Sequence, residues 1–124
     1  MKYMIIGGVA GGASTAARLR RLDEQAEIIL FEKGEYISYA NCGLPYYIGG
    51  VIEERERLFV QTPESFKARF NIEVRIKSEV KAIEPENKQV VIKDWATGKT
   101  YRESFDKLVL SPGAEPVLPP WEGI

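Results

Sequence analysis

The sequence predicts an α/β protein with a parallel sheet, helices packed on that sheet and an inserted antiparallel β-meander. Three observations support this fold class. An apolar run at residues 3–6 leads into a glycine-rich loop at 7–12 and then into helix-forming residues at 13–22. A second apolar run, at residues 28–31, resembles another buried strand. Further along, strand-like runs between residues 78 and 104 are joined by short turns, which is typical of an antiparallel meander.

The loop at residues 7–12 has the form of a nucleotide-binding turn. A strand that turns sharply into a helix directs backbone N–H groups and the positive end of the helix dipole at one point, which suits a phosphate or pyrophosphate. The loop departs from the pattern G-x-G-x-x-G because Val9 stands at the middle glycine position. Glu32, 20 residues beyond Gly12, stands where an acidic side chain would hold a ribose hydroxyl. The alternative is a glycine-rich turn in an ordinary α/β protein.

The composition is that of a globular domain and argues against several classes of function. The chain has 124 residues, of which 44% are hydrophobic and 28% are charged, enough for one domain with a core. The net charge of -1 argues against nucleic acid or membrane surfaces as partners, and no apolar run is long enough to span a bilayer. There is no histidine and only one cysteine, so we expect no metal site and no internal disulfide. This cysteine content fits a reducing cytoplasm.

The first half of the chain is expected to continue with a second parallel strand and a short helix. The strand should cover residues 27–32. Asn41 is a good N-cap residue and Pro45 is tolerated in a first helical turn, so Cys42 is expected to open the short helix. Residues 53–57 are expected to form a charged loop.

The second half is expected to contain one more helix and five strands. The sequence Thr-Pro-Glu at residues 62–64 starts a helix that should run to Phe70, because it supplies a capping hydroxyl, a proline at the first helical position and an acid near the dipole. The expected strands are residues 72–76, the meander strands 78–83, 88–95 and 100–103, and a last buried strand at 107–110. Residues 115–124 hold three prolines and should be extended.

Several motifs together resemble one family. They are the glycine loop, Phe-Glu-Lys at residues 31–33, the stretch 38–46 that contains Cys42, and Leu-Ser-Pro-Gly-Ala at 110–114. They look like the single-cysteine branch of the flavin-dependent pyridine nucleotide-disulfide oxidoreductases, and resemble most the coenzyme A-disulfide reductases and NADH-dependent persulfide reductases. The resemblance implies a Rossmann-like FAD-binding domain in an enzyme that uses FAD and NAD(P)H to reduce coenzyme A disulfide or persulfide.

The same resemblance implies a larger protein, because enzymes of this family are several times longer. Residues 1–114 are then expected to be the first segment of the FAD-binding domain, with the meander at roughly 78–104. Residues 115–124 would be a tail that leads to an NAD(P)H-binding domain. The full-length enzyme is expected to be a cytoplasmic homodimer, and the fragment alone to be inactive. The alternative is a natural short protein.

The resemblance also implies which residues bind FAD and coenzyme A. The expected FAD-binding residues are Gly7, Gly8, Val9, Ala10, Gly11, Gly12, Glu32, Lys33, Asn41, Cys42, Val80, Ser111, Pro112 and Gly113. The expected coenzyme A-binding residues are Ser14, Arg18, Arg21, Ser38, Asn41 and Lys67. The family often has a basic residue near Phe70, which this chain lacks, and Lys67 or Arg69 could replace it. The alternative for Arg18 and Arg21 is a solvated helix face, and Asn41 has one as a helix cap.

Cys42 is the residue expected to carry the chemistry. A thiolate is the nucleophile toward a disulfide or persulfide sulfur, and it is favoured at a helix N-terminus. Because the chain has no second cysteine, the resolving thiol must belong to the substrate, and coenzyme A fits that role. Two other functions stay open. One is an NADH oxidase or peroxidase in which Cys42 cycles through a sulfenic acid. The other is a non-redox nucleotide-binding module in which Cys42 is a small buried hydrophobe.

Overall fold

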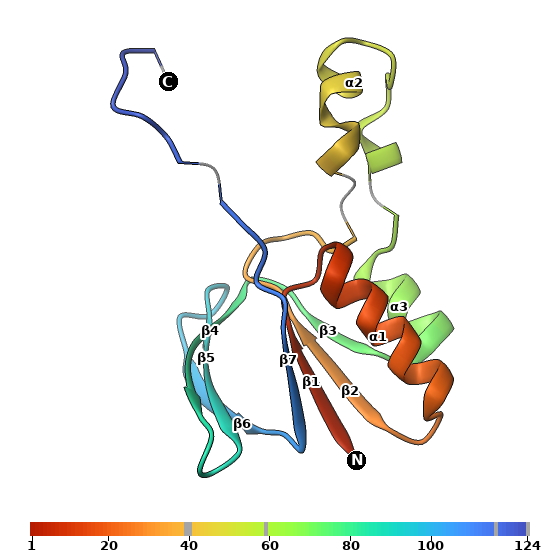
Figure 1. The fold of residues 1–124 in the computed structure, drawn as a ribbon, viewed down its shortest axis with the longest axis vertical. Helices are drawn as coiled ribbons and strands as arrows, with labels where there is room; N and C mark the ends of the chain where they lie inside the picture. The colour runs from red at the N-terminus through yellow and green to blue at the C-terminus, as the bar shows by residue number, and fades with distance from the viewer. Residues whose placement is uncertain (39–40, 59, 116, 124) are drawn as a thin grey trace.

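Over residues 1–38, 41–58, 60–115 and 117–123, which the computed structural model describes, the chain forms two sheets, and the predicted fold class is confirmed (Figure 1). The first sheet is parallel and has the strand order β3-β2-β1-β7. Its strands are β1 (Lys2–Ile6), β2 (Glu27–Phe31), β3 (Glu73–Arg75) and β7 (Lys107–Leu110). The second sheet is the antiparallel meander, with strands β4 (Ser78–Glu84), β5 (Gln89–Asp94) and β6 (Thr100–Ser104).

The parallel sheet lies between two layers. The helices α1 (Ala10–Leu22) and α3 (Pro63–Phe70) cover one face, and the meander covers the other (Figure 1). Ile5 and Leu30 belong to the core on the helix side, whereas Met4 and Ile29 belong to the core shared with Ile92 of the meander. Successive strand residues point to opposite faces, so a sheet covered on both faces needs continuous apolar runs, as β1 and β2 have.

Helix α1 begins at Ala10, so the expectation that the loop runs to Gly12 and the helix starts at residue 13 is wrong. The reason is close packing of backbone on backbone. Gly7 has a φ of +99°, and a Cβ there would collide with the carbonyl of Ser111. A Cβ at Gly12 would collide with the carbonyl of Gly7. The two glycines therefore let the first helical turn lie directly against the end of β1.

The segment around Cys42 also differs from the prediction. Helix α2 runs over Leu44–Ile48, and a 3₁₀ turn, η1 (Asn41–Gly43), precedes it. Gly43 occupies the N-cap position of α2, so Asn41 is not its cap and Cys42 does not open it. Pro45 explains the late start, because it is accommodated within the first helical turn. Helix α2 stands away from the body of the molecule (Figure 1).

Three further expectations can be compared with the structure. Helix α3 starts after Thr62 as predicted, and Thr62 and Ser65 form a reciprocal capping box with N···O distances of 2.9 and 3.1 Å. The expected charged loop at 53–57 overlaps a 3₁₀ turn, η2 (Arg55–Leu58), whose last residue, Leu58, is buried. Strand β7 is not buried throughout: Leu110 is 59% exposed, because β7 lies at the edge of the sheet.

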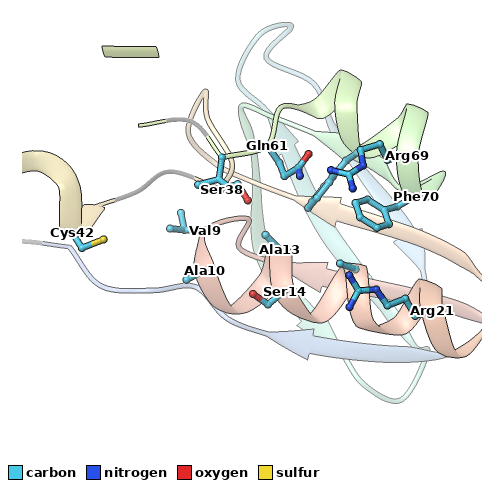
Figure 2. Close-up of a pocket in the computed structure, with 13 residues that line it drawn as sticks. Val9, Ala10, Ala13, Ser14, Arg21, Ser38, Cys42, Gln61, Arg69 and Phe70 are labelled. Carbon is cyan, nitrogen blue, oxygen red and sulfur yellow. The ribbon is translucent and has the colours of Figure 1, made fainter. Parts of the chain in front are cut away.

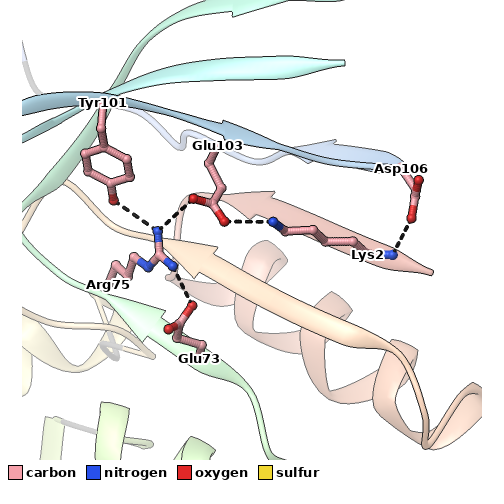
Figure 3. A network of polar contacts seen from close by, with 6 residues as sticks. All are labelled: Lys2, Glu73, Arg75, Tyr101, Glu103 and Asp106. Atoms are coloured by element: carbon pink, nitrogen blue, oxygen red, sulfur yellow. Dashed lines mark hydrogen bonds and ion pairs between the residues drawn. The ribbon is translucent and has the colours of Figure 1, made fainter. Parts of the chain in front are cut away.

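A polar network joins the meander to the parallel sheet (Figure 3). Glu103 of β6 accepts from Lys2 Nζ of β1 at 2.7 Å and lies 3.5 Å from Arg75 Nη1 of β3. Arg75 also donates to the Tyr101 hydroxyl at 3.1 Å and to Glu73 at 2.8 Å. Burial raises the pKa of Glu103, but the Lys2 hydrogen bond and the Arg75 charge outweigh it, and the pKa falls below its usual value. The network fixes the meander against β1 and β3.

Candidate active site

The glycine turn that follows β1 and the first turn of α1 together hold six of the residues predicted to bind a cofactor. They are Gly7, Gly8, Val9, Ala10, Gly11 and Gly12. Val9 is the N-cap of α1 and makes no side-chain capping hydrogen bond, and the first helical turn holds no acidic residue. The first N–H groups of a helix have no partner within the helix. This end of α1 therefore offers backbone donors and a positive dipole end to an anionic group.

Glu32, directly after β2, shapes this turn. One of its carboxylate oxygens accepts from the Gly8 N–H at 3.0 Å, and the other accepts from the Gly34 N–H at 2.8 Å. A carboxylate has about four acceptor positions, so two backbone donors leave capacity for a hydroxyl group. Glu32 thus holds the loop in shape and keeps acceptor positions for a ribose.

A cleft of about 190 Å³ opens between the parallel sheet and the meander, at the carboxyl ends of β1 and β2. It brings together five predicted cofactor residues from distant parts of the chain, namely Gly7, Glu32, Lys33, Val80 and Pro112. Ligands of open α/β sheets bind outside the carboxyl ends of the strands. The free N–H groups at the start of α1, and the glycines that leave room beside them, fit the pyrophosphate of a dinucleotide such as FAD. The Glu32 carboxylate fits its ribose.

Ser111 connects β7 to the same turn. Its hydroxyl is 3.1 Å from the Ile6 carbonyl and 3.3 Å from the Gly7 carbonyl, and its N–H donates to the Ile6 carbonyl at 2.9 Å. Gly113 follows with a φ of +74°, a conformation that favours glycine. Ser111 and Pro112 therefore lie beside the glycine turn, while Gly113 does not line the cleft.

A second and larger cavity, of about 670 Å³, lies between α1 and α3. Cys42 is at one end, next to Val9 and Ala10 at the start of α1 (Figure 2). At the other end, Arg21 of α1 and Arg69 of α3 both point into the gap between the helices (Figure 2). We call this cavity the channel. Cys42 is exposed, so the alternative of a small buried hydrophobe is wrong.

Three of the residues predicted for coenzyme A line the channel together with Cys42: Ser14, Arg21 and Ser38. Ser38 is held in place by its backbone, because its N–H donates to the Gly8 carbonyl at 2.7 Å and its carbonyl accepts from Val60 at 3.0 Å. Ser38 is thereby fixed against the glycine turn.

The structure does not bring two other predicted coenzyme A residues, Arg18 and Lys67, into the channel. Arg18 is exposed on α1 and is not part of the lining. Lys67 lines other clefts beside α3. Residues two positions apart on a helix point about 200° apart, so Lys67 faces away from Arg69. The Asn41 side chain lies outside the described residues.

Sequence reasoning missed part of the α3 side of the channel. Phe66 and Phe70 line it together with Arg69, one of the two residues, with Lys67, expected to replace the family's basic residue near Phe70. Gln61 and Val60, just before α3, also line it. A sequence signal for this wall exists, because residues 66, 69 and 70 are spaced by three and four positions and so lie on one face of the helix.

A family model described as pyridine nucleotide-disulphide oxidoreductase matches residues 1–124, and the chain belongs to this family. The coenzyme A disulfide reductase of Staphylococcus epidermidis is 48% identical over 113 residues, which is 91% of this chain and 26% of that protein. The chain thus spans about a quarter of the length of the curated relatives it matches. The resemblance predicted from the motifs is confirmed.

Solved structures agree with this assignment. The reduced CoADR-RHD of Bacillus anthracis is 60% identical with a TM-score of 0.92, over 96% of this chain and 21% of that one. The NAD-dependent persulfide reductase of A. fulgidus is 38% identical with a TM-score of 0.92, over 99% of this chain and 23% of that one. The NADH-bound water-forming NADH oxidase of Lactobacillus brevis is 29% identical with a TM-score of 0.90, over 96% and 26%. FAD and NAD(P)H are the cofactors of this family of oxidoreductases.

None of the helices described in the structure combines the length and the apolar character that a membrane crossing requires.

Proposed function

We propose that this chain is the FAD-binding part of an NAD(P)H-dependent reductase that acts on coenzyme A disulfide or persulfide through Cys42. The observation that carries the proposal is the channel: a single exposed cysteine lies at one end and two arginines lie at the other, with the start of α1 beside the cysteine. The similarity to the coenzyme A disulfide reductase and to the persulfide reductase supports the same substrate class.

The residues around the cleft would hold FAD. The N–H groups at the start of α1 would face its pyrophosphate, and the remaining acceptor positions of Glu32 would take a ribose hydroxyl. FAD held there would supply the cysteine with electron pairs that come from NAD(P)H. In this arrangement the chain itself binds and orients the cofactor, and it presents the thiol to the substrate.

Cys42 performs the sulfur chemistry. With coenzyme A disulfide, its thiolate attacks one sulfur, the S–S bond breaks, and coenzyme A leaves as a thiolate while Cys42 forms a mixed disulfide with the other half. Two electrons and a proton then release the second coenzyme A and restore the Cys42 thiolate. With coenzyme A persulfide, the Cys42 thiolate attacks the outer sulfur, the S–S bond breaks, and coenzyme A leaves as a thiolate. Two electrons and a proton then release hydrogen sulfide from the Cys42 persulfide and restore the thiolate. Ser14 and Ser38 line the channel between Cys42 and Arg21, where the coenzyme A stem would lie.

The intact protein would be cytoplasmic, since an unpaired cysteine that must stay reduced suits a reducing compartment. That it would be a homodimer is implied only by the resemblance to this family.

Replacement of Cys42 by serine tests the proposal in the intact protein. Serine keeps the size of the side chain but supplies no thiolate at neutral pH, so reduction of coenzyme A disulfide should be abolished. FAD should stay bound and should still be bleached by NAD(P)H in a stopped-flow experiment. Reoxidation by the sulfur substrate at the parent rate would show that Cys42 is not the redox centre.

A second candidate function is an NADH oxidase or peroxidase with a Cys42 sulfenic acid. It is favoured by the TM-score of 0.90 to the Lactobacillus brevis NADH oxidase. Calorimetric titration with coenzyme A separates the two functions, because only the reductase needs a site for it.

A further inference from the structure

Arg20 is buried where the C-terminal ends of α1 and α3 meet. The residue is only 9% exposed, and its guanidinium donates four hydrogen bonds to backbone carbonyls. Two go to Asp23 and Glu24 at the end of α1, at 3.1 and 3.0 Å. The other two go to Phe70 at 2.7 Å and to Asn71 at 3.1 Å, at the end of α3. Phe70 is the last residue of α3, and Asp23, Glu24 and Asn71 directly follow the two helices, so one buried cation bonds the C-terminal ends of both helices together.

The contact to Phe70 continues into the channel. Arg20 holds the Phe70 backbone, and the Phe70 ring packs edge-on against the buried Phe66 with centroids 5.7 Å apart. The Arg69 guanidinium lies over the Phe70 ring at 5.3 Å. A cation over an aromatic face is attracted to it. Arg20 therefore fixes Phe70, and Phe70 in turn orients Arg69.

Arg21, next to Arg20 on α1, reaches the same end of the channel from the opposite wall (Figure 2). Two guanidinium groups at one end of a cavity favour an anion between them, and because both are exposed, water screens their mutual repulsion. The four hydrogen bonds from Arg20 hold the ends of α1 and α3 together, and so fix the separation of the backbones that carry Arg21 and Arg69.

We propose that Arg20 is a positioning residue that sets the spacing of an anion-binding subsite formed by Arg21 and Arg69, and that this subsite takes the phosphorylated nucleotide end of a thiol substrate. The inference rests on the proposed function for its substrate, coenzyme A, whose phosphates are at the end remote from sulfur. Arg69 is thus a ligand in place of Lys67, and Arg20 acts through Phe70 without touching the substrate.

The test uses Arg20→Lys in the intact protein, because lysine keeps the charge but cannot reach four carbonyls on two helices. The probe is adenosine 3',5'-bisphosphate, titrated calorimetrically and used as an inhibitor. We expect the dissociation constant of the bisphosphate and the KM for coenzyme A disulfide to rise about tenfold, with kcat unchanged. The reason is that displaced arginine side chains would bind the phosphates less tightly. Arg102→Lys, in an exposed ion pair on β6, is the control and should change neither value.

A double-mutant cycle shows whether Arg20 acts through Arg69. Arg69→Ala should weaken bisphosphate binding by itself, and Arg20→Lys should add little in that background. Additive effects would overturn the positioning role. Failure of the parent protein to bind the bisphosphate would overturn the subsite itself. Binding that depends on Arg20 without turnover of coenzyme A disulfide would support the subsite and refute only the proposed function.

A second variant covers the case in which Arg20→Lys does not fold. Asn71 has a φ of +52° and an exposed side chain, so Asn71→Ala strains the backbone that carries one Arg20 acceptor while leaving the core intact. It should raise the bisphosphate dissociation constant about threefold with kcat unchanged. Unchanged binding in this variant, with its α3 end loosened in hydrogen exchange, would contradict the proposal.

Discussion

The cleft and the channel lie on either side of the same glycine turn, but they are built differently. The cleft depends on backbone that approaches backbone, at Gly7 and Gly12. The channel depends on side chains that two helices present to each other, such as Arg21 and Arg69. A backbone site fails abruptly, because an added atom has no room. A side-chain site changes by degrees, because each residue contributes one contact. The cofactor half should therefore tolerate very little substitution, whereas the substrate half should tune affinity.

The largest effect is expected from Gly12→Ala. The new Cβ would collide with the Gly7 carbonyl, so the start of α1 must move, and the free energy of unfolding should fall by at least about 3 kcal/mol with loss of FAD. Gly11→Ala is the matched control, since its Cβ would stand 3.5 Å from the Ser111 Cβ, an ordinary contact. It should keep or raise stability, by up to about 1 kcal/mol, because alanine favours helix. Equal losses in denaturant unfolding of the two variants would contradict the backbone account.

A smaller effect is expected from Glu32→Ala. The change removes the acceptor of the Gly8 and Gly34 N–H groups and of the proposed ribose hydroxyl, so FAD binding should weaken by about 1.5–3 kcal/mol. Glu32→Gln keeps one acceptor and should lose less. Flavin retention after extensive dialysis measures both variants. Retention by Glu32→Ala equal to that of the parent would remove Glu32 from the cofactor site.

The sequence predicted the cleft better than the channel, for a physical reason. The glycine turn, Glu32 and the α3 capping box are local signals, because each lies within one turn or one strand end. Even there, the start of α1 was placed too late, since glycine lowers helix propensity and only the close packing of Gly12 on Gly7 explains the earlier start.

The channel needed information that no local pattern holds. Lys67 and Arg69 look equivalent in sequence, and only the rotation of α3 against α1 decides that Arg69 faces Arg21. Arg20 has no such local signal, because all four of its partners are backbone carbonyls and the two on the far helix end, those of Phe70 and Asn71, lie about 50 residues away. The family resemblance supplied Ser14, Arg21 and Ser38, and the fold placed them with Cys42.

The smallest effect on stability is expected in the meander, the wall of the cleft that side-chain contacts hold against the parallel sheet. Glu103→Gln would leave Lys2 and Arg75 without their shared carboxylate, and at pH 7 the free energy of unfolding should fall by about 1–2 kcal/mol. Because the pKa of Glu103 in the folded protein is below the usual 4.5, its stabilisation is present above that value and is lost as the pH falls through the folded pKa. The pKa of Arg75 is raised despite its burial, by the Tyr101 hydrogen bond and nearby carboxylates, so Arg75 stays charged throughout.

Denaturant unfolding of the parent and the variant between pH 7 and pH 3 should therefore show a difference that shrinks below about pH 4.5. The control is Glu84→Gln, which breaks an ion pair with Arg102, a residue whose side chain is 63% exposed, and it should cost less than about 0.5 kcal/mol. A Glu103→Gln difference that stays constant across the pH range would mean that the carboxylate charge does not hold the meander. In that case the apolar contacts of Val90 and Ile92 alone would fix this wall of the cleft.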